Sequence, residues 1–390
     1  MIKITEKYAC CGCTACASAC PRHCITMEED AEGFKYPKVN TILCTDCGLC
    51  EKSCPMAHPE SYNNILQVIA TKHNDETVRK ASSSGGTFSL LAENIILQGG
   101  VVVGCAMDEQ MRAKHIFCEK KENLSLLRSS KYVQSDIKGI YPLVRSLLRK
   151  GRKVLFTGTP CQVAGLHRYL HKPYDNLFCI DVLCHGVPSP KLLDIYKSKM
   201  ESKYGSKAEF INFRYKKCEW KRLYTYINFK NGKQYYKYSE YDVYMNLFLS
   251  NRSQRSSCFH CPFTSIHRQG DISLGDFWGI GKFMPEWDDD KGISLVLLNN
   301  EKGKMLFESI ANLLDGIVCD TEKAIAGNKV LCENIIGEDR RNAFYSDFVE
   351  YGYDAAIDKH VKIDPYPKQL YFTIMRRVKD RIYKIIKKGY

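Results

Sequence analysis

Short apolar runs alternate with segments of helical character over the middle of the chain. VVVGCAM (101–107), KVLF (153–156) and NLFCIDVL (176–183) are apolar enough to predict buried strands. Residues 81–100 predict a helix that starts after serines and glycines and ends at a glycine pair. Strands that alternate with helices predict βαβ units and a largely parallel sheet.

Apolar and polar residues alternate one by one further along the chain, which is typical of antiparallel strands. The segments 209–217 and 224–239 show this alternation, and Asn231-Gly232 in the second predicts a hairpin turn. Residues 294–300 predict another strand, and residues 302–314 predict a helix. This part of the chain therefore has an α+β pattern.

The last segment combines apolar and basic residues with a helical period. Apolar residues recur at every fourth position from Leu370, and arginines and lysines occupy most of the other faces. The pattern predicts a basic amphipathic helix, which could contact an anionic membrane surface or an acidic partner protein. A terminal helix packed on the body, with a solvated charged face, fits the same pattern.

Two cysteine runs near the N-terminus repeat each other. The first is Cys10-x2-Cys13-x2-Cys16-x3-Cys20-Pro21, and 34 residues later the second is Cys44-x2-Cys47-x2-Cys50-x3-Cys54-Pro55. The spacing is that of bacterial two-cluster ferredoxins, in which the fourth cysteine of each run binds the other cluster. Zinc knuckles, the alternative, usually pair two short units across a longer gap. The predicted [4Fe–4S] ligands are Cys10, Cys13, Cys16 and Cys54 for the first cluster, and Cys44, Cys47, Cys50 and Cys20 for the second.

The repeat and the changes of pattern predict an N-terminal two-cluster ferredoxin domain followed by a mixed core of α/β and α+β type. The predicted segments are a ferredoxin domain at 1–60, an α/β domain at 61–205, an α+β domain at 206–350 and a basic helical tail at 351–390.

The amino-acid composition indicates the cellular compartment and the class of binding partner. The chain has 20 cysteines in 390 residues and a formal net charge of +13. It shows no signal-peptide core and no membrane-spanning stretch, so we expect a cytoplasmic protein, in which a disulfide framework is disfavoured. The charge favours acidic partners, but ligand thiolates would offset part of it. The basic residues do not interleave with a nucleic-acid reading motif, which disfavours a zinc-ribbon nucleic-acid binder.

Four more cysteines lie at turns or in a short pair. They are Cys161 and Cys184, each after an apolar strand, and Cys258 and Cys261, in a C-x2-C unit. The carboxyl ends of strands in α/β sheets collect ligands, so these four could hold a third cluster. A zinc site that includes His260 or His267, or simple buried thiols, explains the same residues. The other cysteines follow no spacing and are expected to be buried thiols: Cys11, Cys24, Cys105, Cys118, Cys179, Cys218, Cys319 and Cys332.

The stretch Ser82-Ser83-Ser84-Gly85-Gly86 opens the helix predicted within 81–100. Unpaired N–H groups at a helix N-terminus attract phosphate, and glycine lets a phosphate approach the backbone. On its own the stretch fits an ordinary helix cap better, since it is neither a Walker loop nor G-x-G-x-x-G.

Together these motifs resemble the coenzyme F420 hydrogenase/dehydrogenase beta-subunit family. The resemblance runs from the ferredoxin module through SSSGGTFSLL, SKYVQS, FTGTPCQVAGL, DVLCHGVPS, INFRYKK, SCFHCPF, DISLGDFWGI and KGISLVLLN, over about residues 5–315. It implies an FAD-binding core, with 61–205 and 206–350 similar to the family's N- and C-terminal parts. The flavin residues it implies are Ser83, Ser84, Gly85 and Gly86 at the phosphates, and Lys131, Thr157, Gly158, Gly275, Asp276 and Trp278 in the pocket. It also implies that Cys161, Cys184, Cys258 and Cys261 bind a third [4Fe–4S] cluster.

The predicted function is an iron–sulfur flavoprotein oxidoreductase. It would pass electrons between an organic hydride donor or acceptor, such as the deazaflavin coenzyme F420, and a one-electron carrier, through FAD and the clusters. The expected partners are that small molecule and a redox protein, either a ferredoxin-like carrier or an enzyme subunit. Lys131 is the one side chain we place near the flavin ring, and no stretch identifies a deazaflavin pocket. The alternative is an electron-transfer module that feeds a partner enzyme and has no substrate chemistry of its own.

Overall fold

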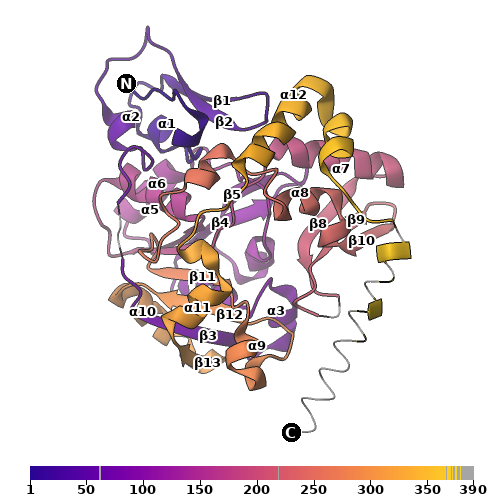
Figure 1. The fold of residues 1–390 in the computed structure, drawn as a ribbon. Coiled ribbons are helices and arrows are strands. Elements are labelled where there is room, and N and C mark those ends of the chain that lie inside the picture. Colours follow the sequence, from indigo (N-terminus) through magenta and orange to yellow (C-terminus); the bar gives the residue numbers. More distant parts are fainter. Residues whose placement is uncertain are drawn as a thin grey trace.

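The computed structural model describes residues 1–60, 63–217 and 219–365, and further along residues 367–369, 371, 374, 375 and 378. Figure 1 shows a small N-terminal unit at one end of a larger body, which is built around one sheet with a smaller sheet beside it. The basic helix predicted from Leu370 lies almost entirely outside the described residues. Within them, no helix is long and apolar enough to cross a membrane.

The two cysteine runs of the N-terminal unit fold alike, as their repeat predicts. Each leads into a short helix, α1 (Ala15–Ala19) in the first run and α2 (Leu49–Lys52) in the second. Between the runs, β1 (Ile25–Glu29) and β2 (Lys35–Val39) form an antiparallel hairpin. The backbone is left-handed at the same two steps of each run, namely Gly12 (φ 71°) and Thr14 (φ 64°), then Asp46 (φ 50°) and Gly48 (φ 72°).

An eight-stranded sheet forms the centre of the larger body (Figure 1), with the strand order β13-β3-β12-β11-β7-β6-β4-β5. Four of the strands, β4, β6, β7 and β12, lie where the apolar runs predict them. The strands are β3 (Gln67–His73), β4 (Val101–Met107), β5 (Ala113–Cys118), β6 (Val154–Gly158), β7 (Leu177–Val182), β11 (Ile272–Asp276), β12 (Ser294–Leu298) and β13 (Leu314–Cys319).

The sheet is mixed, so the expectation of a largely parallel sheet is wrong. β4, β6, β7 and β11 run parallel, whereas the pairs β4–β5, β11–β12, β12–β3 and β3–β13 are antiparallel. β5 follows β4 after a short turn, and such turns join only antiparallel strands. Because the four parallel strands share a direction, their carboxyl ends at Met107, Gly158, Val182 and Asp276 meet at one edge, here called the carboxyl edge.

Helices cover both faces of this sheet. α4 and α10 pack on one face against strand residues such as Val102, Leu155 and Val296. On the other face, α5 and α6 cover β4, β6 and β7, while α9 and α11 cover β3 and β12. The helices are α3 (Glu76–Ala81), α4 (Thr87–Leu97), α5 (Ile140–Arg149), α6 (Pro160–Leu170), α9 (Ile280–Phe283), α10 (Glu301–Glu308) and α11 (Thr321–Gly327).

The smaller sheet is antiparallel, as predicted, with the order β10-β9-β8 and Gly232 (φ 79°) in its hairpin turn. Its core also takes side chains from three helices and Phe34 from the ferredoxin unit. The elements are β8 (Ala208–Tyr215), β9 (Tyr224–Phe229), β10 (Gln234–Tyr238), α7 (Pro190–Tyr204), α8 (Val243–Leu249) and α12 (Glu338–His360), which is broken at Gly352. The large sheet takes strands from both sides of residue 205, and α12 crosses residue 350, so packing joins the segments that the sequence pattern divides.

Helix α6 meets the first cysteine run at Gly165. A Cβ atom at this position would lie 2.9 Å from Cys13 Sγ and 2.8 Å from the hydroxyl oxygen of Tyr141. Cys11 and Cys13 are buried in the same apolar cluster as α5 and α6. The absence of a side chain at Gly165 therefore lets the ferredoxin unit sit directly on α6.

Gly165→Ala should weaken cluster binding, although alanine is favoured over glycine in a helix interior by about 1 kcal/mol. The added methyl group must displace Cys13, a predicted ligand of the first cluster. We expect less iron per chain than in the wild type and a faster loss of visible absorbance in air. Gly316→Ala is the matched control, because its Cβ would meet its nearest neighbour at 3.4 Å. A wild-type iron content in Gly165→Ala would contradict the close packing.

Candidate functional site

One cavity in the ferredoxin unit gathers cysteines from both runs. Its lining includes Cys20 of the first run together with Cys44, Cys47 and Cys50 of the second. The backbone N–H of Ile2 donates to Cys50 Sγ at 3.2 Å, and that of Asp46 donates to Cys44 Sγ at 3.4 Å. Cys47 is exposed. These four cysteines are the ligands predicted for the second cluster, with Cys20 crossing over from the other run.

Cys54 of the second run lies with the first run in return. Burial, together with the nearby Cys10 and Cys54 sulfurs, raises the pKa of the Cys16 thiol to about 12. Cys13 adjoins Cys16. Thiols this deeply buried become thiolates only when a metal replaces the stabilisation that water would give. The structure thus brings together the four ligands predicted for the first cluster.

A second cavity, here called the edge cavity, opens where the carboxyl edge meets the ferredoxin unit. Its lining includes the four cysteines implied for a third cluster, Cys161, Cys184, Cys258 and Cys261. Cys161 lies in the first turn of α6 and Cys184 follows β7, so the carboxyl edge supplies both. Burial raises the pKa of the Cys184 thiol well above its ordinary value, and the neighbouring Cys258 and Cys161 sulfurs raise it further.

The histidines of the zinc alternative lie outside the lining of the edge cavity. His260 Nε2 lies 2.7 Å from Glu338 Oε2, and His267 Nδ1 lies 2.6 Å from Asn64 Oδ1. Across the described residues, no three His, Cys, Asp or Glu side chains converge on one ion position. The four thiols line one cavity together, and neither histidine is part of that lining.

Cys11 is a residue whose place the repeat does not predict. It aligns with Thr45 in the second run, so the spacing leaves it among the buried thiols. In the structure its thiol contacts those of Cys13 and Cys161, and it lines the edge cavity. Cys11 therefore connects a predicted ligand of the first cluster with one of the third. No sequence signal marks it, because the contact with Cys161 is made only by folding.

The loop implied for the flavin phosphates is held tightly before α4. Ser84 Oγ donates to the Ile293 carbonyl at 2.7 Å. A Cβ atom on Gly85 would lie 2.3 Å from the Thr71 carbonyl oxygen, so only glycine fits there. Gly86, at φ 96°, directly precedes the first residue of α4. The loop is thus fixed by the sheet, with the N–H groups of the helix N-terminus beside it.

Arg214, near the end of β8, ties this loop to the GDFWG block. Its guanidinium donates to the two Asp276 oxygens at 2.6 and 3.1 Å and to the Ser83 carbonyl at 3.1 Å. It also lies 5.3 Å from the ring centre of Trp278, which stacks on Trp220 at 4.7 Å. Burial lowers the pKa of Arg214, but Asp276 and Tyr132 together raise it by more, so the guanidinium stays charged.

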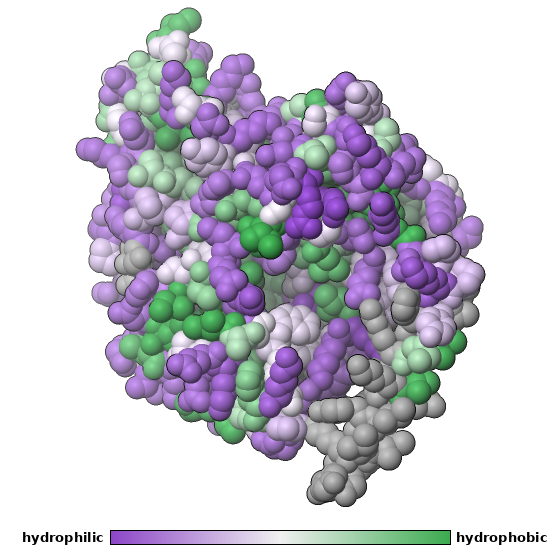
Figure 2. Space-filling view, viewed as in Figure 1, coloured by the Kyte–Doolittle hydropathy of each residue, from purple (hydrophilic) through white to green (hydrophobic). Residues whose placement is uncertain are grey.

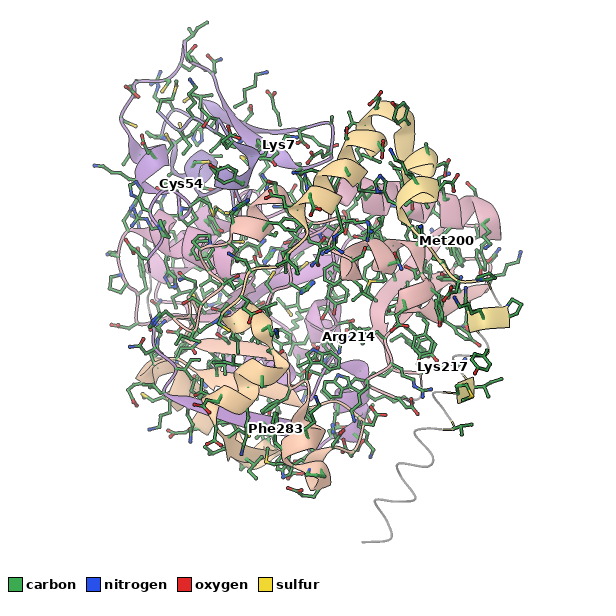
Figure 3. The ribbon with its side chains drawn as sticks, in the orientation of Figure 1. Lys7, Cys54, Met200, Arg214, Lys217 and Phe283 are labelled. Atoms are coloured by element: carbon green, nitrogen blue, oxygen red, sulfur yellow. The ribbon has the colours of Figure 1, made fainter. Side chains whose placement is uncertain are left out.

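Arg214 and its neighbour Lys216 are functional candidates that the sequence motifs alone do not predict, although both stand in INFRYKK. The Lys216 ammonium donates to the carbonyls of Arg79, Ser84 and Lys291 at 2.8, 2.7 and 2.8 Å. Figure 3 places Arg214 near the middle of the molecule, and Figure 2 shows the same face hollowed there. The two cations hold the phosphate loop through the Ser83 and Ser84 carbonyls.

The remaining flavin residues lie in the scaffold around this site. The Lys131 ammonium donates to the carbonyls of Leu126 and Arg128 at 3.1 and 2.5 Å, and burial lowers its pKa to about 8. Thr157 Oγ1 donates to the Val103 carbonyl at 3.0 Å. Gly158 and Gly275 lie at the carboxyl ends of β6 and β11. The Lys131 ammonium is therefore bound to its own loop.

The site combines features that a flavin nucleotide requires. The loop offers a helix N-terminus and glycines for a phosphate, and Arg214 and Lys216 add positive charge beside it. Trp278 is half-buried, so part of its aromatic ring remains accessible at this site. The residues present thus fit FAD.

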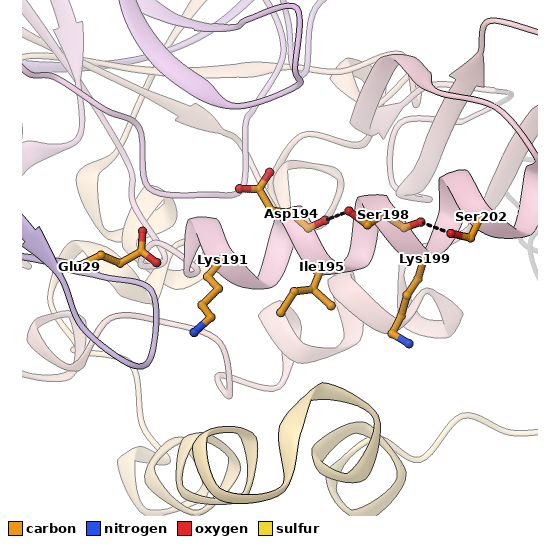
Figure 4. A pocket seen from close by; sticks show the side chains of 7 residues that line it. All are labelled: Glu29, Lys191, Asp194, Ile195, Ser198, Lys199 and Ser202. Carbon is orange, nitrogen blue, oxygen red and sulfur yellow. Dashed lines mark hydrogen bonds between the residues drawn. The ribbon is translucent and has the colours of Figure 1, made fainter.

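A separate groove along α7 shows no such chemistry (Figure 4). Ser198 Oγ donates to the Asp194 carbonyl at 2.8 Å, and Ser202 Oγ donates to the Ser198 carbonyl at 3.0 Å. The hydroxyls are therefore occupied by the helix itself. Its described lining includes no cysteine and none of the predicted site residues.

Two family matches cover much of the region just described. Residues 151–315 match the C terminus of the coenzyme F420 hydrogenase/dehydrogenase beta subunit, and residues 9–57 match a 4Fe-4S dicluster domain. The resemblance to the F420 hydrogenase/dehydrogenase beta subunits is confirmed. Their C-terminal region here includes Cys161, Cys184 and the Cys258–Cys261 pair, as well as Arg214 and Asp276.

Individual relatives align over parts of their length. Coenzyme F420-dependent sulfite reductase of Methanocaldococcus jannaschii is 25% identical over 192 residues, 48% of this chain and 29% of that protein. One component of the Na(+)-translocating ferredoxin:NAD(+) oxidoreductase complex of Acetobacterium woodii is 34% identical over 68 residues, 17% of this chain and 19% of that protein. The chain thus spans less than a third of either relative. The solved F420-reducing [NiFe] hydrogenase complex of Methanosarcina barkeri has a chain that aligns with 75% of this chain and 96% of its own, at 15% identity and a TM-score of 0.48.

Asp276→Asn should destabilise the protein, because it leaves the buried Arg214 guanidinium without its carboxylate. Removing one partner of a buried pair costs about 3 kcal/mol of unfolding free energy. Urea denaturation without air measures this. Asp354→Asn, which breaks the exposed pair with Lys199, should cost less than about 1 kcal/mol. Equal effects of the two variants would refute a buried role for Asp276.

Proposed function

We propose that this chain is an iron–sulfur flavoprotein oxidoreductase, which exchanges hydride with a small organic molecule and single electrons with a carrier protein. The observation that supports this most is the line of contacts from the ferredoxin unit through the edge cavity to the flavin-site residues. A deazaflavin such as coenzyme F420, which is in the names of the matching family and of one relative, is the organic partner we propose.

Short steps join the proposed sites. The Cys11 thiol connects the ferredoxin ligands with Cys161. Cys161 stands three positions after Gly158, the last residue of β6, which belongs to the proposed flavin pocket. Leu183 directly precedes Cys184, and its side chain packs against the predicted flavin residue Gly275. A Cβ atom on Gly275 would lie 3.0 Å from the Leu183 side chain. The edge cavity therefore adjoins both the ferredoxin unit and the proposed flavin pocket.

The predicted flavin residues would hold FAD at both of its ends. Ser83, Ser84, Gly85 and Gly86 would contact its phosphates, and Thr157, Gly158, Gly275, Asp276 and Trp278 would line the pocket. When bound, the flavin supplies hydride chemistry and the clusters supply one-electron steps. Arg214 orients Asp276 and the Ser83 carbonyl, and Lys216 fixes the loop through Ser84.

The carrier protein would meet the chain at the ferredoxin end. Cys47 is exposed there, and Ile42 is 92% exposed. Leu43 and Leu49 on the same segment are exposed as well. Contiguous patches of exposed apolar side chains are typical of surfaces that bind other proteins. We therefore propose this end as the contact with a ferredoxin-like carrier or a partner enzyme subunit.

Anaerobic purification followed by iron, sulfide and flavin analysis tests the proposal. Three [4Fe–4S] clusters correspond to about twelve irons per chain. Cys258→Ser should then lose about four irons and keep the irons of the ferredoxin unit, because its sulfur lines the edge cavity. Cys319→Ser is the control, since it removes a thiol of β13 that lies outside this lining.

Other contents of iron, zinc and flavin would indicate another function. About eight irons without flavin would favour an electron-transfer module, and zinc without iron would overturn both functions. Reduced coenzyme F420 should bleach the flavin absorbance of the anaerobic protein. Failure of F420 and of other hydride donors to do so, with flavin present, would contradict the oxidoreductase.

A further inference from the structure

Five arginine side chains are buried among the described residues, and four of them pair with a carboxylate. Such pairing is the rule, because a charge away from water is costly unless an opposite charge faces it. The four pairs are Arg79–Asp289, Arg214–Asp276, Arg268–Asp181 and Arg341–Glu32.

Arg255 is the fifth, and it is fully buried, with 0% of its surface exposed. No carboxylate of the described ranges lies within ion-pair distance of it. Its Nε donates to the Cys10 carbonyl at 2.7 Å, and its Nη1 and Nη2 donate to Gln134 Oε1 at 3.1 Å and to the Lys35 carbonyl at 2.9 Å. These acceptors are neutral, so they satisfy the N–H groups but not the charge.

The Tyr36 ring lies 4.2 Å from the Arg255 guanidinium, but burial raises the pKa of the Tyr36 hydroxyl, so this group stays neutral. The groups near Arg255 that can carry negative charge are therefore cysteine sulfurs. Arg255 Nη2 donates to Cys10 Sγ at 3.6 Å, and Cys10 is a predicted ligand of the first cluster. Arg255 also lines the edge cavity, and Cys258 follows three residues later in the same turn. One buried cation thus faces the ligands of two proposed clusters.

An iron–sulfur cluster with four thiolate ligands carries net negative charge, which increases when the cluster is reduced. We propose that Arg255 is the buried counter-ion of the first and third clusters, and that it raises the reduction potential of the first. This rests on the proposed function for the third cluster only. A positive charge and an N–H bond to a ligand sulfur both stabilise the reduced form, which is how proteins raise such potentials. Arg255 is in this sense a positioning and tuning residue rather than a catalytic one.

Two variants test the charge of Arg255 in the intact, anaerobic protein. Arg255→Gln removes it, and Gln134→Glu places a carboxylate beside Nη1 while Arg255 stays in place. In both, EPR-monitored redox titration should show the reduced-to-oxidised ratio of one ferredoxin-unit cluster fall about tenfold at a given potential. For a one-electron couple this is a shift of about 59 mV to more negative potential. The other cluster of the ferredoxin unit should keep its potential.

Two controls separate charge from packing. Gln134→Met loses the same amide contacts without adding a charge and should shift the potential less than Gln134→Glu. Arg341→Lys alters a buried arginine that already has its carboxylate and should leave the potentials unchanged. If Arg255→Gln does not assemble, Gln134→Glu decides alone. Wild-type potentials in Gln134→Glu with a wild-type iron content would overturn the inference.

The iron content keeps this test independent of the proposed function. A protein with about eight irons whose potential shifts in Gln134→Glu would lose its third cluster but keep the role of Arg255 at the first. A protein with about twelve irons and unshifted potentials would keep the proposed function and lose that role.

Discussion

The contact between the first cysteine run and helix α6 fixes the relative positions of all the proposed redox sites. Gly165 offers no side chain at this contact, so Cys13 reaches the helix and Cys11 reaches Cys161 in its first turn. Arg255 holds the same run from the other side through the Cys10 carbonyl. Because α6 starts at the carboxyl edge, the ferredoxin unit is held beside the strand ends, where ligand-binding loops gather.

Local patterns predicted the parts of this arrangement that depend on spacing. The spacing of the two cysteine runs predicts that the fourth cysteine of each run joins the other run. In the structure Cys20 lies with the second run and Cys54 with the first. Local spacing does not predict the roles of Arg214 and Arg255, because the groups that each contacts lie far away along the chain. The direction of β12 could not be predicted either. Its sequence is apolar like that of β7, and only its pairing in the sheet makes it antiparallel.

The formal net charge of the chain does not show how charged side chains are arranged in its interior. Most of the buried arginines are neutralised by carboxylates that come from distant segments, so these ion pairs also join the segments to one another. The buried thiols differ from these arginines, because a thiol that is shielded from water becomes a charged thiolate only when it binds a metal. Metal binding and folding are therefore coupled in this chain, as in other proteins whose ligands are buried.

The exposed position of Cys47 has a consequence for the lifetime of the protein in air. Oxygen attacks iron–sulfur centres from solvent, and among the described ligands of the ferredoxin unit Cys47, which lines the cavity of the second cluster, is the exposed one. Cys11 and Cys13, which pack against α5 and α6, are buried. Oxidative damage would then proceed inward, so that a protein handled in air first loses its connection to the carrier while its deeper centres survive.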